Sequence, residues 1–252
     1  GSEQNWSESS LVWLERGSIS NFSSVQLEDY AETDVKAQLS SHVELALSDD
    51  AEINVGNTNY FDENGNFLFT LQPGYSLLQG VLGLNNSLQG NDDNNLIHSS
   101  NGSDIIDGGI GNDILYAGGG NDSLMGGEGR DRIYGGDGDD TLRGGTGEDD
   151  YLRGDAGNDI YEFASGDGDT KIFNYDTKES SNDTLRFLAG IEVGDVVVSR
   201  KSNDLVLTIQ STGEVITVER HFHHVELELN AIEFADGTSW DTATINTMVL
   251  QA

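Results

Sequence analysis

The chain contains no cysteine, a single proline and few positively charged residues. The absence of cysteine excludes disulfide bonds and thiolate metal sites. Only 12 lysines and arginines stand against 45 aspartates and glutamates, which gives a formal net charge of −33. A negative field of this size repels phosphate backbones and anionic lipid, so we expect neither nucleic-acid binding nor membrane insertion. No run approaches about 18 uninterrupted apolar residues, which excludes a transmembrane helix. Such a surplus of carboxylates either solvates a disordered chain or binds cations.

Glycine and aspartate gather in the middle of the chain, where 17 of the 32 glycines lie between Gly108 and Gly157. Written in nines, this window reads GGIGNDILY (108–116), AGGGNDSLM (117–125), GGEGRDRIY (126–134) and GGDGDDTLR (135–143). GGTGEDDYLR (144–153) has one extra residue, and GDAGNDIYE (154–162) returns to nine. Degenerate copies precede these, SSNGSDIID (99–107) and more weakly QGNDDNNLI (89–97), and the half-copy SGDGDTKIF (165–173) lacks the sixth-place aspartate. The chain therefore carries a nine-residue repeat.

The repeat has the pattern Gly-Gly-x-Gly-x-Asp-x-Φ-x, where Φ is a large apolar residue. The three residues around Φ form a short strand with one inward side chain, and the glycines allow the six residues before them to turn tightly. Two repeats then make one coil of a flattened, right-handed parallel roll, in which turns two repeats apart stack. The sixth-place aspartates would form two columns, one of Asp104, Asp122, Asp140 and Asp159, the other of Asp113, Asp131 and either Asp149 or Asp150.

Carboxylates stacked at the strand spacing of about 4.7–4.9 Å need a positive counter-charge. Ca²⁺ takes about six to eight carboxylate and carbonyl oxygens, whereas Mg²⁺ is smaller and stricter in geometry. The sequence therefore predicts several Ca²⁺ ions in the turns, held by the aspartates and by carbonyl groups of the glycines. The candidate ligands are Asp104, Gly109, Gly111, Asp113, Gly118, Gly120, Asp122, Gly127, Gly129, Asp131, Gly136, Gly138, Asp140, Gly145, Gly147, Asp149, Asp150, Gly157 and Asp159.

This repeat resembles the calcium-binding nonapeptide of RTX proteins. Strand-like segments at 182–187, 195–200, 203–210 and 214–222, with an Asp-Gly hairpin in 231–241, resemble the haemolysin-type calcium-binding related domain that follows such repeats. The expected fold is all-β. It comprises an N-terminal β-rich region of no recognised family (1–87), the calcium-binding parallel roll (88–175) and a C-terminal β capping domain (176–252).

The N-terminal region offers weaker signals. Residues 35–47 alternate like a strand, although a helical spacing from Leu27 to Leu39 competes with that interpretation. Asn64-Gly65 indicates a hairpin between Tyr60-Phe61 and residues 67–69, and Asp62 opens a loop that lacks the glycine and glutamate of an EF-hand. Gly1-Ser2 resembles a remnant of cloning, so we expect the chain to be a piece of a longer protein.

Two further groups of polar residues carry open alternatives. His221, His223 and His224 resemble metal ligands, but residues along one strand rarely converge on one ion, and no HExxH motif is present. Asp236 and Asp241 are candidates for a terminal calcium site, or for carboxylates that cap a hairpin.

The resemblance implies a calcium-binding module of a large protein that a type I secretion system exports unfolded and that folds outside the cell. The parent would be an adhesin or surface protein, with a surface glycan or protein as ligand. The alternative is the C-terminal tail of a secreted lipase, protease or polysaccharide epimerase. The fragment itself is not expected to be an enzyme, because it contains no GxSxG, no HExxH and no Ser/His/Asp order. Ice binding is rejected because the third- and fifth-place residues are irregular, and the repeats show no aromatic row for a polysaccharide.

Overall fold

The computed structural model describes residues 44–48, 51–54, 67–71, 76–80, 83–147, 149–175, 181–224 and 227–251. Strands β1 (Glu44–Ser48) and β2 (Ala51–Asn54) pair antiparallel. Most of the alternating segment, the Asp62 loop, the Asn64-Gly65 turn and the strand expected at Tyr60-Phe61 lie outside the described residues. The following strand, β3 (Phe67–Thr70), pairs in parallel with β5 (Asn86–Gln89).

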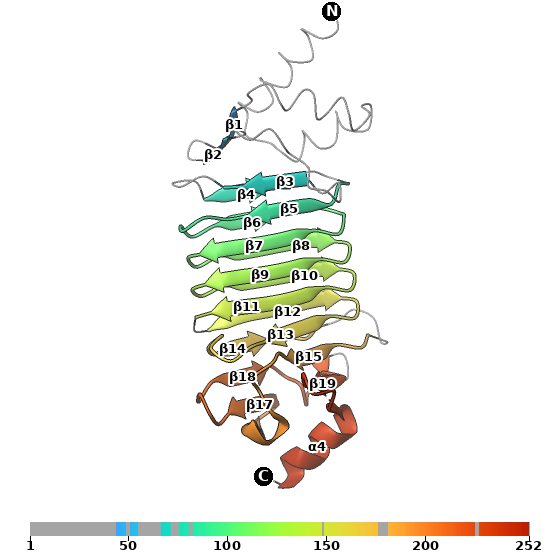
Figure 1. The fold of residues 1–252 in the computed structure, drawn as a ribbon. Helices are drawn as coiled ribbons and strands as arrows, with labels where there is room; N and C mark the ends of the chain where they lie inside the picture. The colour runs from blue at the N-terminus through green and yellow to red at the C-terminus, as the bar shows by residue number, and fades with distance from the viewer. Residues whose placement is uncertain are drawn as a thin grey trace, which may run out of the picture.

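Two nine-stranded sheets form the body of the molecule, with their coils stacked along one axis (Figure 1). Sheet I contains β3, β5, β7 (Ile105–Ile110), β9 (Ser123–Glu128), β11 (Thr141–Thr146), β13 (Ile160–Phe163), β15 (Thr184–Phe187), β19 (Ala231–Glu233) and β20 (Ser239–Asp241). Sheet II contains β4 (Leu77–Gln79), β6 (Leu96–His98), β8 (Ile114–Gly119), β10 (Arg132–Asp137), β12 (Asp150–Ala156), β14 (Thr170–Ile172), β18 (Val215–Val218), β17 (Asp204–Ile209) and β16 (Val196–Lys201). The predicted all-β parallel roll is confirmed.

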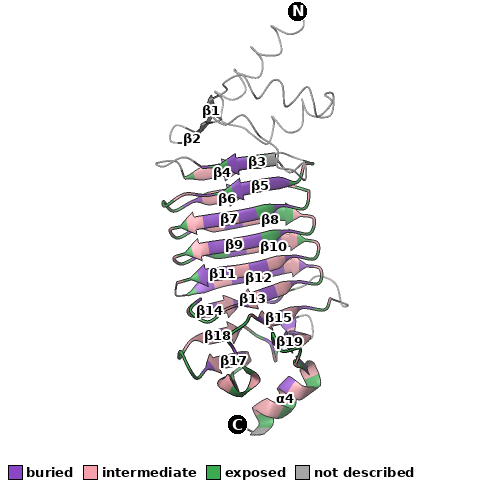
Figure 2. Ribbon diagram, viewed as in Figure 1, coloured by how far each residue is buried: buried purple, intermediate pink, exposed green. Residues whose placement is uncertain are grey.

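The apolar eighth-place residues form the core between the sheets. Ile106 pairs in register with Leu124, and Leu124 with Leu142, so one coil comprises 18 residues. Leu115 and Ile133, which belong to sheet II, have no exposed surface. Buried residues recur in successive strands of the stack (Figure 2). From β7 to β12, one large inward side chain per strand thus fills a narrow core, and its neighbours on both sides stay partly exposed.

The structure corrects the register of the first weak repeat. Ile97, rather than Leu96, pairs with the core residue Leu115 and is completely buried. The repeat is therefore GNDDNNLIH (90–98), and Asn95 stands at its sixth place. Two adjacent apolar residues satisfied the sequence pattern equally well, and only the packing distinguishes them.

Parallel pairing continues beyond residues 88 and 175, where the sequence placed the ends of the roll. Before residue 88, β3, β4 and β5 already form coils, although they lack the glycine-rich turns. After residue 175, β15 pairs with β13 and β18 pairs with β14, both in parallel. Each added strand buries apolar side chains like those of the repeats, so the sheets grow without the repeat motif.

The C-terminal segment then closes the stack. β16, β17 and β18 pair antiparallel, as do β19 and β20. The rings of Phe163, Phe187, Phe234 and Trp240 contact one another in succession, with centroids 6.1, 5.2 and 4.7 Å apart, and so join the roll to the cap. The short 3-10 helix η1 (Val193–Asp195) and helix α4 (Thr242–Gln251) complete this end. The sequence did not predict α4. Within the described ranges, no helix has the length and apolar character needed to cross a membrane.

An aromatic row runs along the outer face of sheet II, contrary to the expectation from the sequence. The rings of His98 and Tyr116 stack with centroids 4.5 Å apart, and those of Tyr116 and Tyr134 with centroids 4.7 Å apart. Tyr151 follows at 6.0 Å from Tyr134. The sequence pattern concealed this row because its members lie one coil apart in the chain and become neighbours only when the coils stack.

Candidate metal centre

The predicted aspartate columns exist, and a ladder of hydrogen bonds holds each of them. In the first column, the backbone N–H of Asp104 donates to Oδ1 of Asp122 at 2.7 Å, and that of Asp122 to Oδ1 of Asp140 at 2.8 Å. The N–H of Asp140 donates to Oδ1 of Asp159 at 3.0 Å. These four residues are 1 to 3% exposed. Each carboxylate therefore lies inside the turn region and accepts a hydrogen bond from the coil before it.

The second column resolves the choice between Asp149 and Asp150. The N–H of Asp113 donates to Oδ1 of Asp131 at 2.7 Å, and that of Asp131 to Oδ1 of Asp150 at 2.8 Å. Asp150 is completely buried. The extra residue of this repeat, Asp149, is exposed, has a φ of 68° and forms an ion pair with Lys171. Asp149 is therefore displaced from the column, and Asp150 takes the sixth place.

Five carboxylates of the columns keep one buried oxygen without a hydrogen-bond partner within the described part of the chain. These atoms are Oδ2 of Asp113, Asp122, Asp131, Asp140 and Asp150. Burial is the main cause that raises the pKa of these groups, to about 7 for Asp113, Asp122 and Asp150, about 6 for Asp131 and about 8 for Asp140. Buried carboxylates need a partner in order to remain charged. The buried carboxylates of the two columns therefore need bound protons or cations to neutralise their charge.

A backbone carbonyl oxygen lies beside three of these orphaned atoms, those of Asp113, Asp131 and Asp140. A Cβ built on Gly126 would lie 2.4 Å both from Oδ2 of Asp131 and from the carbonyl oxygen of Gly144. On Gly108, it would lie 2.5 Å from Oδ2 of Asp113 and 2.4 Å from the carbonyl oxygen of Gly126. Carboxylate and carbonyl oxygens from successive coils thus converge in the space that the first-place glycine leaves open.

This donor set fits Ca²⁺. No group of three or more histidine, aspartate or glutamate side chains suited to a metal occurs among the described residues, so a cation here must use backbone carbonyls as well. A mixed set of carboxylate and carbonyl oxygens is what Ca²⁺ takes. The first-place glycines Gly108, Gly126, Gly135, Gly144 and Gly154 were missing from the predicted ligands. Glycine stands at the first place of most repeats, although Ala117 and Ser99 stand there in two of them, and this preference was the signal that could have found them.

The predicted second- and fourth-place glycines have a steric role. A Cβ on Gly127 would lie 1.9 Å from the carbonyl oxygen of Gly109, and one on Gly129 would lie 1.8 Å from that of Gly111. The φ of Gly127 is 116°, which a residue with a side chain rarely adopts. A Cβ would lie equally close, between 1.7 and 2.2 Å, to a carbonyl oxygen of the preceding coil at Gly136, Gly138, Gly145, Gly147 and Gly157. The coils can approach this closely only at glycine. The ligand role of these carbonyls stays a prediction.

Other polar residues extend the columns at both ends. Asn86 precedes Asp104, and its N–H donates to Oδ1 of that residue at 2.6 Å. Asp183 follows Asp159 and accepts from its N–H at 2.9 Å. Asn95 precedes Asp113 in the second column, and the buried Thr170 pairs with Asp150. The sequence pattern missed Asn86 and Asp183 because they lie outside recognisable repeats.

Asp104 differs from the interior aspartates of its column. The Oδ2 atom of Asp104 accepts a hydrogen bond from the Ser99 hydroxyl at 2.5 Å. Burial raises its pKa, and this hydroxyl opposes the rise. The serine stands where most of the repeats have their first-place glycine. The first column thus begins with a carboxylate whose two oxygens are satisfied within the protein.

The HFHH histidines take separate positions. His221 is completely buried, and its Nδ1 accepts the backbone N–H of Leu229 at 3.0 Å. Burial lowers the pKa of His221 to about 4, so this side chain is neutral at physiological pH. His223 and His224 are exposed, and their ring centroids lie 5.3 Å apart. The position of His221 is that of a core residue.

Asp236 and Asp241 cap local structure. Oδ1 of Asp236 accepts the N–H of Thr238, and Oδ1 of Asp241 accepts the N–H of Thr244, each at 2.8 Å. These hydrogen bonds lower the pKa of both carboxyls. Asp241 directly precedes α4 and caps its N-terminus. Of the two alternatives, the structure therefore favours the capping role.

Comparison with known proteins identifies both parts of the molecule. Residues 82–115, 116–149 and 145–169 match the RTX calcium-binding nonapeptide repeat, and residues 204–244 match the haemolysin-type calcium binding protein related domain. The iron-regulated protein FrpA of Neisseria meningitidis serogroup C is 45% identical over 95 residues, which cover 36% of this chain and 8% of FrpA. The chain thus carries RTX repeats in a parallel β-roll, and Ca²⁺ is the cofactor of these repeats.

Proposed function

We propose that this chain is a module of a large secreted RTX protein, and that Ca²⁺ bound in the two aspartate columns holds its roll together outside the cell. The observation that carries this proposal is the set of five buried carboxylates, each with an oxygen that has no partner. Ca²⁺ supplies charge to these oxygens, and the neighbouring carbonyls complete its shell. Because these groups meet only in stacked coils, the binding energy of the metal is also folding energy.

The same arrangement suits export of an unfolded chain. Without Ca²⁺, the carboxylates of the columns repel one another, and each strand from β7 to β12 buries only one large apolar side chain. Such a segment cannot offset its conformational entropy. A type I secretion system would therefore pass an extended chain, and the millimolar Ca²⁺ outside the cell would fold it. The absence of cysteine is compatible with this route.

The parent is proposed to be an adhesin or surface protein. The short share of FrpA that the chain covers supports a large parent protein. The matched repeats are a calcium-binding, structural type, which supports a structural role for the fragment, and an enzyme elsewhere in the parent is the alternative. An antibody against this fragment separates the two by localising the parent. Retention on the cell surface supports an adhesin, and release into the medium together with a hydrolase or epimerase activity contradicts it.

Calcium titration tests the module itself. We expect chelated protein to gain β-structure in far-UV circular dichroism with a sigmoidal dependence on Ca²⁺, and calorimetry to give several ions per chain. Asp122→Asn removes the charge of a column residue and should lower the number of bound ions. The control is Asp137→Asn, which alters an exposed third-place residue and should change nothing. Equal losses in the two variants, or equal folding by Mg²⁺, would contradict the proposal.

A further inference from the structure

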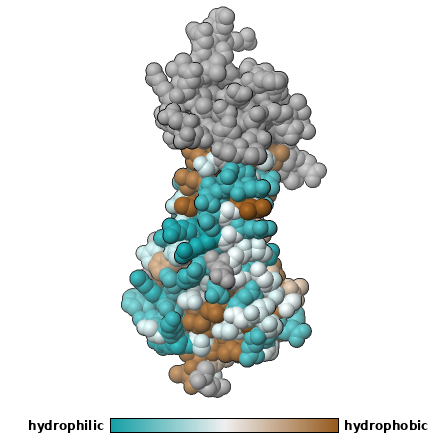
Figure 3. Space-filling view, turned by 90° about the vertical axis from the view of Figure 1, so that its left-hand side faces the viewer, coloured by the Kyte–Doolittle hydropathy of each residue, from teal (hydrophilic) through white to brown (hydrophobic). Residues whose placement is uncertain are grey.

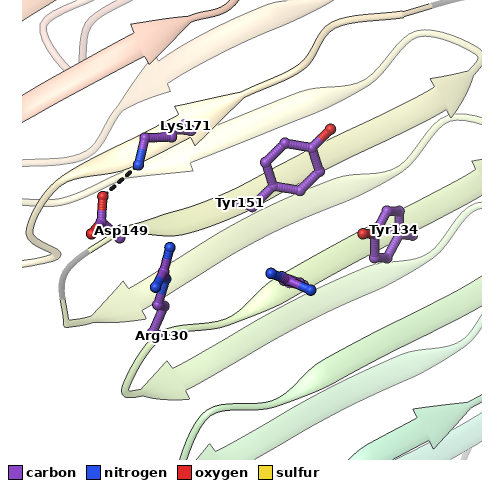
Figure 4. A pocket seen from close by; sticks show the side chains of 6 residues that line it. Arg130, Tyr134, Asp149, Tyr151 and Lys171 are labelled. Atoms are coloured by element: carbon purple, nitrogen blue, oxygen red, sulfur yellow. Dashed lines mark hydrogen bonds and ion pairs between the residues drawn. The ribbon is translucent and has the colours of Figure 1, made fainter.

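A hollow on the outer face of sheet II combines cations with aromatic rings. Its volume is about 270 Å³, and its lining residues are Arg130, Arg132, Tyr134, Asp149, Tyr151 and Lys171 (Figure 4). Three of the chain's 12 positive side chains thus gather at one place on a protein of net charge −33. Asp149 is the one carboxylate among the lining residues. The hollow therefore carries a net positive charge that the chain as a whole lacks.

Stacking of the coils builds this hollow. Arg132 on β10 lies in register with Tyr151 on β12, and Tyr151 with Lys171 on β14. The one-residue insertion places Asp149 at the end of the same strands, where it forms an ion pair with Lys171 (Figure 4). A carboxylate of the protein itself thus already occupies part of the cationic site. The contact indicates the chemistry that a ligand would use there.

The aromatic row extends the site along the stack axis. His98, Tyr116, Tyr134 and Tyr151 follow one another across β6, β8, β10 and β12. At a strand spacing of about 4.8 Å, these four coils span roughly 15 Å. A ligand that used the whole row would have to be linear and run across the strands.

The orientation of the rings limits the kind of ligand. The planes of Tyr116 and Tyr134 are inclined by only 10°, and those of His98 and Tyr116 by 19°. Their faces therefore cover one another, and a ligand meets ring edges and phenol oxygens. Ring edges carry partial positive charge, and phenol groups donate hydrogen bonds to oxygen. Binding of single-stranded nucleic acid depends on open ring faces for base stacking. The stacked rings of His98, Tyr116 and Tyr134 cover the faces between them, and only Tyr151, tilted by 51° against Tyr134, departs from this stack.

We propose that this face binds the carboxylate or sulfate groups of a linear anionic polysaccharide. Arg130 and Arg132 bind the acidic group, because guanidinium groups pair with such oxygens through two parallel hydrogen bonds. Lys171 supplies a further charge when the ligand displaces Asp149, and the tyrosine hydroxyls hydrogen-bond the sugar oxygens. On the side of the molecule that Figure 3 shows, hydrophilic residues dominate the middle of the described part, and hydrophobic ones lie near both of its ends. This role goes beyond calcium-dependent folding.

The test uses the full chain in saturating Ca²⁺ and isothermal titration calorimetry. The probes are hyaluronan, which carries carboxylates, chondroitin sulfate, which adds sulfates, neutral dextran and single-stranded DNA. We expect saturable binding of at least one acidic glycan, with weakening by salt, and no binding of dextran. Tighter binding of hyaluronan identifies the carboxylate as the group that is bound, and tighter binding of chondroitin sulfate identifies the sulfate. Binding of neither glycan, equal binding of dextran, or tighter binding of DNA would overturn the proposal.

Charge-neutral variants locate the site. The double variant Arg130→Gln/Arg132→Gln should weaken glycan binding by about tenfold or more, the factor expected for loss of a charge-assisted hydrogen bond. The matched control Arg186→Gln/Lys201→Gln removes the same charge elsewhere and should weaken it less than about twofold. Far-UV circular dichroism in Ca²⁺ confirms the fold of each variant. Should the double variant fail to fold, Lys171→Gln replaces it, and an unchanged affinity there overturns the assignment.

Discussion

Removal of Ca²⁺ at alkaline pH should unfold the roll, and the buried carboxylates give the size of the effect. Asp113, Asp122 and Asp150 have pKa values of about 7, Asp131 of about 6 and Asp140 of about 8, against an ordinary value of 3.8. One pKa unit corresponds to about 1.4 kcal/mol. Once the metal is gone and all five are charged, each of them destabilises the folded state by roughly 3 to 6 kcal/mol.

Five such contributions exceed the whole stability of an ordinary domain, which is about 5–15 kcal/mol. Between pH 4 and pH 8, the folded calcium-free roll binds more protons than the unfolded chain, because burial raises the pKa of these carboxyls. Its stability therefore falls as the pH rises through this window. Acidification to about pH 5 in the presence of chelator should restore part of the structure that Ca²⁺ supplies at pH 8.

Far-UV circular dichroism with EGTA and with Ca²⁺, each at pH 8 and pH 5, measures both effects. Asp140→Asn provides the sharpest variant, because it removes the carboxylate with the highest pKa and keeps its shape and its Oδ1 acceptor. With chelator, the variant should gain less structure on acidification than the unchanged protein does. With Ca²⁺, the variant should be less stable than the unchanged protein. A chelated spectrum at pH 8 that equals the calcium-loaded one, or no gain of structure on acidification, would refute the reasoning.

Three further changes test the coils and their end. Asp131→Ala should lower bound Ca²⁺ and the melting temperature more than Asp104→Ala does, because Asp104 ends its column beside a serine hydroxyl; equal losses in calorimetry would count against stacked sites. Gly127→Ala places a Cβ against backbone atoms at a positive φ and should destabilise the calcium-loaded protein by about 3 kcal/mol or more. The control Gly213→Ala also has a positive φ, but its Cβ meets open space, so it should cost about 1 kcal/mol. Urea unfolding measures both losses of stability. Truncation after residue 175 should abolish calcium-dependent folding or weaken its affinity, and an unchanged calcium midpoint would show an independent roll.

Some features of the roll could be predicted from the repeat pattern alone. Because 18 residues make one coil, the places of Asp122 and Asp140 above one another follow from the spacing alone, as does the inward direction of Leu124. The choice of Ca²⁺ follows from the density of carboxylates and glycines. These properties are periodic, so each depends only on residues at a fixed distance along the chain.

Other features depend on contacts that no fixed spacing encodes. Both Asp149 and Asp150 satisfied the pattern, and only burial places Asp150 in the column. The ends of the roll lack the motif, since β15 and β18 join the sheets through apolar side chains and backbone pairing. The steric need for glycine at position 127 arises from a carbonyl group one coil away.

The sequence by itself determined the architecture, the cation and the two columns, because a nine-residue period fixes which side chains repeat on each surface of a stacked coil. The tertiary structure alone decided which carboxylate oxygens have no partner, where the stack ends, and that tyrosines and arginines from successive coils form one cationic face. The physical reason is distance: these groups meet across strands about 4.8 Å apart, although one coil of chain separates them in the sequence.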